Sequence, residues 1–386
     1  MRIAVVYDCL FPWTVGGGER LYRALAEEFA ARGHDVTYLT RRQWTGPTPL
    51  VEGVRIEAIA AEADLYDAVG ARRLRPAIGF ALALFWHLVR HRRRYDAVLV
   101  SALPATNVPA VRAALVGSRV VVCSDWLEVW PRKQWQDYSG PVVGTVAWIV
   151  QCVAARVSPL STCHSALTAR RLEESGARSA PLRSPGLIFE TDRGVPRLIE
   201  PAAARVVFVG RHIEDKRVQA LPGAIAYARR SFPDLTAQVY GDGPLRPAVL
   251  AEIERLGLAG VVTAPGFVSQ AELDEAVRAA SVLVNPSARE GYGLVVVEAA
   301  ALGTPVVLVA GEDNAAVELV EHGVNGAVAL SIAPEDLGDA IVEVVRAGAG
   351  LRRSAHAWFE QVAPTSSVGV TAARILDALE QRRAVR

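Results

Sequence analysis

Residues 281–298 of the chain have the sequence SVLVNPSAREGYGLVVVE. The apolar residues 281–285 predict a buried strand, and residues 294–302 predict a helix. Glu290 would then lie in a loop above the end of the strand, and Glu298 just over one turn into the helix. A strand, a glycine-containing loop and a helix in this order are typical of a parallel α/β sheet.

The start of the predicted helix is a candidate anion site. Its unpaired N–H groups and the positive end of its dipole favour a negative charge. Glutamates beside such a site indicate a ligand that also carries hydroxyl groups, and a nucleotide sugar has both. Two glutamates eight residues apart are equally compatible with a structural role. The hypothesis therefore depends on the rest of the chain.

The composition indicates two globular domains, because 386 residues exceed one ordinary core. The net charge is +1, yet residues 1–190 have a balance of +6 and residues 191–386 a balance of −5. Residues 1–7 predict a first strand and not a signal peptide. The four cysteines show no metal-ligand spacing and indicate free thiols in a reducing compartment, so we expect a cytoplasmic protein.

The first lobe, residues 1–185, alternates predicted strands and helices. The strands cover 3–7, 36–39, 97–100 and 120–123, and the helices cover 20–31, 77–91 and 109–115. This order favours a doubly wound parallel sheet. Residues 180–204 are rich in Pro, Gly and Arg without periodicity and predict a linker.

The second lobe, residues 205–365, repeats the pattern. The strands cover 205–209, 237–240, 261–263, 281–285 and 306–309, and the helices cover 216–230, 244–256, 270–280, 294–302 and 315–321. Ser269 and Glu272 form a capping box. Residues 366–386 predict a helix that returns to the first lobe. Two Rossmann-like lobes that face each other across a cleft would bind a ligand at their loops.

Three glycine-containing loops follow predicted strands and would let backbone N–H groups approach a phosphate. They contain Gly16 with Gly17, Gly210, and Gly241. The first loop departs from the GxGxxG pattern, which argues against a nicotinamide cofactor. A structural turn is the alternative at each position.

Lysine is rare in this chain, since only Lys133 and Lys216 occur among 42 basic residues. Lys216 and Arg211 both lie in the loop after strand 205–209, where two cations can meet a diphosphate. A solvated basic pair is the structural alternative.

These motifs together resemble the donor domain of the retaining glycosyltransferases of family 4, which have the two-lobed GT-B fold. The resemblance covers residues 205–330 and rests on VGRHIEDKR, YGDGP, GFVS and PSAREGYGLVVVEAAALGTPVV. The first lobe is compatible with this family but less diagnostic.

The resemblance implies a role for each matching residue. Arg211 and Lys216 would hold the donor diphosphate, Glu290 would face the donor sugar, and Glu298 would bind the ribose hydroxyls. The remaining donor contacts would come from Gly16, Gly17, Gly210, Gly241, Val268, Gly291, Tyr292, Gly293 and Leu294.

The resemblance also implies the chemistry. The sugar would move from a nucleotide sugar, UDP favoured over GDP, to an acceptor hydroxyl by front-face attack with retention. Arg and Lys would neutralise the diphosphate in place of a metal, and no metal-ligand cluster is visible in the sequence. The acceptor would be a glycan, a lipid-linked sugar or a small molecule.

One departure concerns a histidine that many relatives place at the end of a first-lobe strand. Residues 122–128 read VCSDWLE here and contain no histidine. Asp125 or Glu128 would take over its polar role, or His164 would approach from the next strand. Structural hydrogen bonding is the alternative for all three.

The first lobe contains seven of the eight tryptophans, of which Trp13 and Trp126 are candidates for an acceptor pocket. The apolar run 76–89, followed by RHRRR at 90–94, predicts either a buried helix or a peripheral contact with an anionic membrane. Fourteen apolar residues are too few to span a bilayer.

Two other functions remain open from the sequence. The chain fits a non-catalytic subunit that binds a sugar nucleotide, and it fits a sugar-nucleotide 2-epimerase. A nucleic-acid partner has no support, because the basic residues follow no recognisable binding module.

Overall fold

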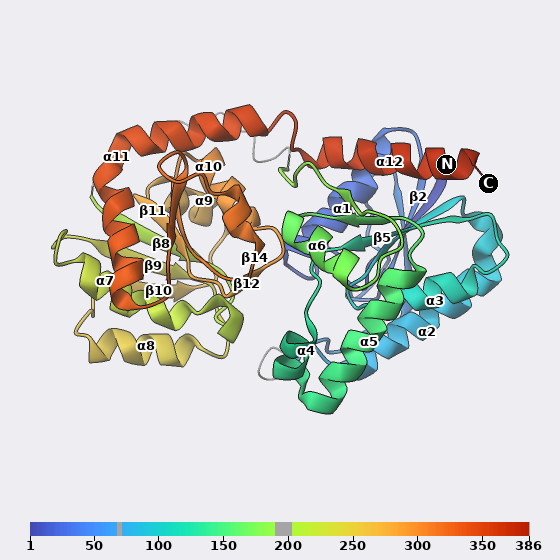
Figure 1. The fold of residues 1–386 in the computed structure, drawn as a ribbon, viewed down its shortest axis with the longest axis horizontal. Helices are drawn as coiled ribbons and strands as arrows, with labels where there is room; N and C mark the ends of the chain where they lie inside the picture. The colour runs from blue at the N-terminus through green and yellow to red at the C-terminus, as the bar shows by residue number, and fades with distance from the viewer. Residues whose placement is uncertain (68–71, 190–202, 386) are drawn as a thin grey trace. The chain divides into compact units, whose positions relative to one another are not determined.

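The computed structural model describes residues 1–67, 72–189 and 203–385, which form two compact units. The first unit contains the described residues of Met1–Asp67, Ala71–Glu190 and Thr365–Arg386, and the second those of Thr191–Pro364. Each unit is a parallel sheet covered by helices (Figure 1). Residues 190–202 of the predicted linker lie outside the described residues.

The first unit contains a seven-stranded sheet in the order β3-β2-β1-β4-β5-β6-β7. Every neighbouring pair in it is parallel. The order reverses between β1 and β4, which is the doubly wound arrangement. Its strands are β1 Arg2–Val6, β2 Asp35–Arg41, β3 Val54–Ala60, β4 Ala97–Ser101, β5 Val121–Trp126, β6 Ser161–Cys163 and β7 Leu182–Arg183.

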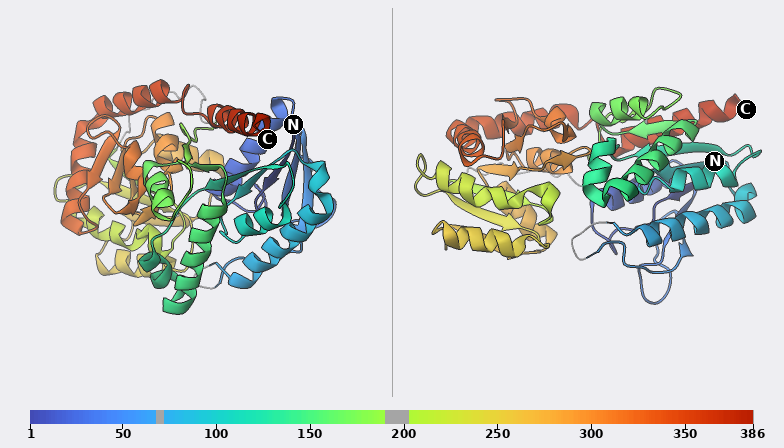
Figure 2. Two further views of the ribbon diagram at one scale, coloured as in Figure 1. Left: turned by 45° about the vertical axis from the view of Figure 1, so that its right-hand side comes forward. Right: turned by 60° about the horizontal axis from the view of Figure 1, so that its bottom comes forward.

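The helices of the first unit cover its sheet. They are α1 Gly17–Ala31, α2 Leu74–His91, α3 Asn107–Ala114, α4 Arg132–Ser139, α5 Pro141–Val157, α6 Ala166–Glu174 and α12 Val368–Ala384, with a short 3-10 helix, Arg92–Arg94, after α2. Helix α3 packs against both α2 and α5, and α12 packs against α1. Figure 2 shows α12, in dark red, against the rest of the first unit from two further sides.

The apolar run at 76–89 forms the centre of α2. One side of this helix is buried against the core, so the prediction of a buried helix is correct for that side only. Among the residues that the structure describes, no helix combines the length and apolar character needed to cross a bilayer.

The second unit contains a six-stranded sheet in the order β10-β9-β8-β11-β13-β15, again parallel. Its strands are β8 Arg205–Val209, β9 Thr236–Tyr240, β10 Val262–Gly266, β11 Val282–Asn285, β13 Val306–Val309 and β15 Gly326–Ala329. A separate parallel pair joins β12 Arg289–Glu290 to β14 Asp313–Asn314. The strands of the main sheet are largely apolar because helices cover them.

The helices of the second unit follow its strands. They are the 3-10 helices Glu214–Lys216, Val218–Ala220 and Ala315–Leu319, and the α-helices α7 Leu221–Ala228, α8 Arg246–Arg255, α9 Gln270–Arg278, α10 Leu294–Ala301 and α11 Pro334–Val362. The continuous helix predicted over 216–230 is wrong at its start, because Arg217 has a left-handed backbone with φ 47°. The helix predicted over 315–321 is likewise a 3-10 turn.

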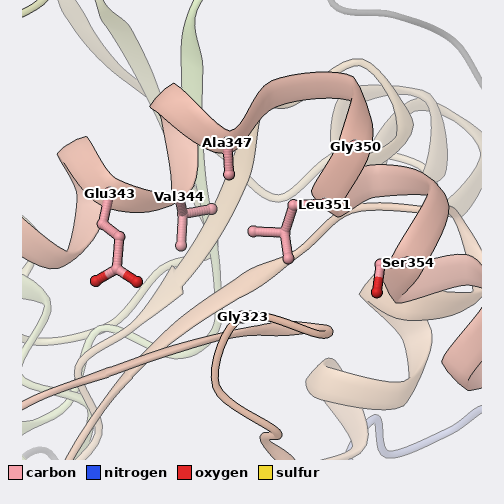
Figure 3. A pocket seen from close by; sticks show the side chains of 8 residues that line it. Gly323, Glu343, Val344, Ala347, Gly350, Leu351 and Ser354 are labelled. Carbon is pink, nitrogen blue, oxygen red and sulfur yellow. The ribbon is translucent and has the colours of Figure 1, made fainter.

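Helix α11 is kinked at Gly348, whose φ of 58° and ψ of −139° are not helical. A small pocket lies where the two halves of α11 meet the loop at Gly323 (Figure 3). None of the candidate site residues lines it.

Candidate active site

The switch point of the second sheet lies between the adjacent parallel strands β8 and β11. Ligands of doubly wound sheets bind at such a point, beyond the carboxyl ends of the strands. The loop after β8 contains Gly210 and Arg211 and leads to Lys216. The loop after β11 leads to Glu290 and then to α10. Both loops therefore start at the same edge of the sheet.

Lys216 and Glu290 meet there. Lys216 Nζ donates to Glu290 Oε1 over 2.5 Å, and Asn285 Nδ2 donates to the same oxygen over 3.1 Å. Their side chains are 22% and 15% exposed, so solvent reaches both. Burial opposes the charge on Glu290, but Lys216 and these hydrogen bonds outweigh it and hold the pKa of Glu290 below its ordinary value. Glu290 is therefore ionised at neutral pH.

A surrounding frame fixes the position of Glu290. Arg289 forms an ion pair with Asp215, and the Ala288 N–H donates to the Asp215 carbonyl over 2.8 Å. Glu290 is paired with Asn314 in the β12–β14 ladder. The sequence pattern does not predict roles for Asp215 and Asn285, although Asp215 adjoins Lys216 and Asn285 ends the strand before Glu290.

Helix α10 begins directly after Gly293, whose φ of 103° strongly favours glycine. A Cβ at this position would also come within 2.5 Å of the Ala316 Cβ. The chain bends at residues 291 and 292, and α10 begins four residues after Glu290. Glu298, on the second turn, is half-buried, as are Gly291, Tyr292 and Leu294.

The loops after β8, β9 and β10 are in backbone contact. The Gly241 N–H donates to the Gly266 carbonyl over 3.0 Å, and a Cβ at Gly241 would overlap the Gly210 carbonyl oxygen. Gly241 is thus needed for this close approach of the two backbones. The exposed Arg211 and the half-buried Val268 follow in these loops, at the same edge of the sheet.

In the first unit, Asp125 is the second-to-last residue of β5 and is fully buried. It accepts hydrogen bonds from Tyr22 Oη over 2.6 Å and from Thr162 Oγ1 over 2.5 Å, and His164 Nε2 lies 3.0 Å from its carboxylate. Burial raises the pKa of Asp125, but His164 and these hydrogen bonds outweigh it and keep the pKa below its ordinary value. Asp125 is therefore the ionised centre of a buried polar network.

The other first-unit candidates lie in different surroundings. Trp126 is 1% exposed and donates to Ser124 Oγ, whereas Trp13 is 41% exposed and lies edge-on to Trp44. Glu128 is exposed and accepts from Trp130 Nε1 over 2.7 Å. Of the two tryptophans, Trp13 presents an aromatic surface to solvent.

Gly16 is the N-cap of α1, and Gly17 is the first residue of that helix. The buried Glu19 lies in the first turn, so this N-terminus already has a carboxylate beside it. An ion pair that the sequence pattern does not predict joins the buried Asp8, just beyond β1, to the half-buried Arg72.

Within the described part of the chain, no group of three or more His, Cys, Asp or Glu residues is arranged to hold a metal ion.

Two family models match this chain. Residues 203–347 match the model of glycosyl transferases group 1, and residues 16–184 match the glycosyl transferase 4-like domain. The chain belongs to the group 1 glycosyltransferases. The two-lobed Rossmann-like fold, GT-B, agrees with this assignment.

Individual relatives of this glycosyltransferase differ in how much of it they cover. It is 26% identical to glycogen synthase of Mycobacterium tuberculosis over 92% of this chain and 89% of that protein. It is 34% identical to D-inositol 3-phosphate glycosyltransferase of Segniliparus rotundus, over 41% of this chain and 36% of that protein.

Solved structures share the fold along the whole chain. Sucrose-phosphate synthase from Thermosynechococcus elongatus has a TM-score of 0.77 at 18% identity and covers 100% of both chains. The Anabaena protein HepE in complex with UDP has a TM-score of 0.76 at 18% identity and covers 99% of this chain and 100% of its own.

Proposed function

We propose that this glycosyltransferase moves a sugar from a nucleotide-sugar donor to an acceptor hydroxyl with retention at the anomeric carbon, as family 4 enzymes do. The observation that carries the proposal is the contact between Lys216 and Glu290 at the switch point of the second sheet. It combines a cation, a carboxylate and the N-terminus of α10. A nucleotide sugar needs these three partners for its diphosphate and its hydroxyls.

Each group has a defined role in this proposal. Lys216 and Arg211 bind the diphosphate, and the N–H groups at the start of α10 bind a phosphate oxygen or a sugar hydroxyl. Glu290 accepts a hydrogen bond from the donor sugar, and Glu298 accepts from the ribose. Gly210 and Gly241 let backbone approach the nucleotide closely, and Val268 borders the base. The donor contacts of Gly16 and Gly17 stay a prediction.

The proposed reaction exchanges one bond for another. The bond between the anomeric carbon and the phosphate oxygen breaks, and the acceptor oxygen bonds to the same face of that carbon. The acceptor proton passes to the departing phosphate oxygen, so the enzyme needs no protein nucleophile. Cations at the leaving group lower the barrier because negative charge develops there. Lys216 and Arg211 supply this charge in our proposal, which assigns no step to a metal.

UDP is the proposed nucleotide, with GDP second. The fold neighbour HepE has been solved in complex with UDP and with UDP-glucose, which supports this choice. On the acceptor side, Trp13 is favoured over Trp126 because its ring is exposed. Asp125 and His164 are proposed to support the acceptor side through their buried network rather than by direct contact.

Calorimetric titration tests the donor site. Wild-type protein, Glu298→Ala and Glu335→Ala are titrated with UDP, GDP, ADP and their sugars. We expect one nucleotide to bind wild type and Glu335→Ala equally, because Glu335 is exposed at the start of α11. Glu298→Ala should bind it roughly tenfold or more weakly, as expected for a hydrogen bond to a charged group.

A second titration makes the assignment of Glu298 specific. The 2′- and 3′-deoxy forms of the same nucleotide should bind wild type more weakly than the ribonucleotide. In Glu298→Ala, the affinities for the ribonucleotide and for its deoxy forms should differ less than they do in wild type. Equal discrimination in both proteins would remove Glu298 from the ribose site, and no binding of any nucleotide by folded wild type would overturn the donor proposal.

A further inference from the structure

Helix α2 exposes a stripe of large apolar side chains. Its five members are Leu74, Ile78, Leu82, Trp86 and Val89, with exposed fractions from 39% to 56%. They recur every three or four residues and therefore lie along one side of the helix. A separate set, which includes Phe80, Leu84 and Leu88, packs into the core. The exposed stripe is thus additional to the apolar face that the fold requires.

Helix α5 has a second stripe of the same kind. Val142, Val146, Ile149 and Val153 are 43% to 74% exposed and recur every three or four residues. The buried residues of this helix, Gly144, Gln151, Ala154 and Ala155, lie on its other side. The stripe on α5 therefore faces away from the core.

The two stripes belong to one layer of helices. Helix α3 packs against both α2 and α5, and the three helices lie together in Figure 1. All three belong to connections that cross the sheet in the same direction, from β3 to β4, from β4 to β5 and from β5 to β6. Right-handed crossovers place such helices on one face of the sheet. The two stripes therefore lie on the same face of the sheet, and together they are named here the α2–α5 surface.

Basic residues flank the α2 part of this surface, and its helices lack acidic side chains. Helices α2, α3 and α5 contain no Asp or Glu. Residues 68–124 contain nine arginines and one acid, Asp96. The arginines include Arg73 and Arg75 at the start of α2 and Arg90, Arg92 and Arg93 at its end.

Trp86 and Arg90 show the character of the surface in one contact. The Arg90 guanidinium lies 5.4 Å from the centroid of the exposed Trp86 ring. An aromatic ring beside a cation suits the boundary between lipid headgroups and acyl chains, where one end of a side chain is apolar and the other hydrated.

We propose that the α2–α5 surface docks this protein onto an anionic lipid membrane. The apolar side chains enter the boundary of the acyl chains, and the arginines contact anionic headgroups. The excess of arginines beside this surface favours an anionic membrane over a second copy of the chain, because the second copy would carry the same positive charge. The inference extends the membrane contact expected for residues 76–94 to α5, and it does not depend on the proposed donor site.

Vesicle co-sedimentation of the whole chain tests the proposal without any activity. Wild type is mixed at low salt with phosphatidylcholine vesicles that contain or lack phosphatidylglycerol. We expect it to sediment with the anionic vesicles, to remain in solution with the neutral ones, and to dissociate as salt is raised. Binding only to neutral vesicles, or to neither, would overturn the proposal.

Substitutions then locate the contact. Leu82→Glu with Trp86→Glu changes α2, Val146→Glu with Ile149→Glu changes α5, and each pair should reduce vesicle affinity roughly tenfold or more. Leu50→Glu is the matched control, because Leu50 is 99% exposed in the same unit but lies outside these helices. All substituted side chains are exposed, so the fold should tolerate each change.

Light scattering on the same proteins separates membrane docking from self-association. Wild type and the glutamate variants should have the same molar mass in solution. A wild-type oligomer that the α5 variant dissociates, with vesicle binding unchanged, would instead assign the surface to contacts between copies. Unchanged vesicle binding in both pairs of variants would likewise reject the α2–α5 surface.

Discussion

Lys216 and Glu290 follow the adjacent strands β8 and β11, and their side-chain ends lie 2.5 Å apart at the carboxyl edge of the second sheet. Seventy-four residues separate them in the sequence. Both side chains are also partly exposed to solvent. The contact therefore places a partly neutralised cation where an anionic ligand can reach it.

Lys216→Ala should slow sugar transfer. Losing one charged contact to the diphosphate should cost about 1.5–3 kcal/mol in the transition state, which is roughly ten- to a hundredfold in rate. The chain provides a matched control in its other lysine, the exposed Lys133 on α4. Donor-dependent turnover, or hydrolysis of the donor without acceptor, is the measurement. Equal losses in Lys216→Ala and Lys133→Ala would contradict the assignment.

Glu290→Gln should change how stability depends on pH. The folded pKa of Glu290 lies below its ordinary value of 4.5, so the ionised pair stabilises the protein above about pH 4.5 and this contribution is lost as the pH falls through the folded pKa. The difference in melting temperature between wild type and variant should be constant from pH 5 to 7 and shrink toward pH 3. If the difference in melting temperature did not change with pH, the charge of Glu290 would not contribute to the stability of the fold.

Asp125→Asn should destabilise the first unit. The asparagine has one acceptor oxygen for the three partners of the carboxylate, which leaves a buried group unpaired. We expect a loss of about 2–4 kcal/mol in thermal or denaturant unfolding. Glu128→Gln, an exposed change nearby, should cost less than about 0.5 kcal/mol. Nucleotide affinity should be unchanged in both variants. If Asp125→Asn lost nucleotide affinity without losing stability, Asp125 would instead be a residue of the ligand site.

Gly241→Ala should impair the second unit. Its φ of 109° disfavours alanine, and the new Cβ would overlap the Gly210 carbonyl oxygen, so we expect a loss above about 2 kcal/mol. Gly79→Ala is the contrasting change, because Gly79 lies in α2 with open space around it. It should raise stability by about 0.5–1 kcal/mol. The melting temperatures of the two variants are the measurement. If Gly241→Ala were as stable as wild type, the loops that contain Gly241 and Gly210 would be able to move apart.

The central strands could be predicted because helices cover them on both sides. Strands β8 and β13 coincide with their predicted ranges, and the Ser269 hydroxyl accepts from the Glu272 N–H as the capping box predicts. Strand β3 was missed because it is the edge strand of its sheet and alternates buried with exposed residues. Helices α4 and α5 were missed because no single apolar periodicity extends across the break at Gly140.

The site was predicted unevenly for a similar reason. The sequence pattern identifies Lys216 and Glu290 as candidates, but it contains no signal for the contact between them, which depends on the strand order. The network around Asp125 joins α1, β5 and β6, so its partners Tyr22 and Thr162 could be found only from the fold. Burial likewise separates Trp126 from Trp13, since both look alike in the sequence.

The position of α12 affects how the protein is made. Its backbone joins the first unit through Val368, whose N–H donates to the Ile188 carbonyl over 2.8 Å, and Ile375 and Leu379 are buried there. During translation, the ribosome therefore synthesises the entire second unit before it synthesises α12, which belongs to the first unit. Until then the face of α1 that α12 covers stays open. The first unit is begun first and finished last, so the apolar face that Ile375 and Leu379 cover becomes buried only after the second unit has been synthesised.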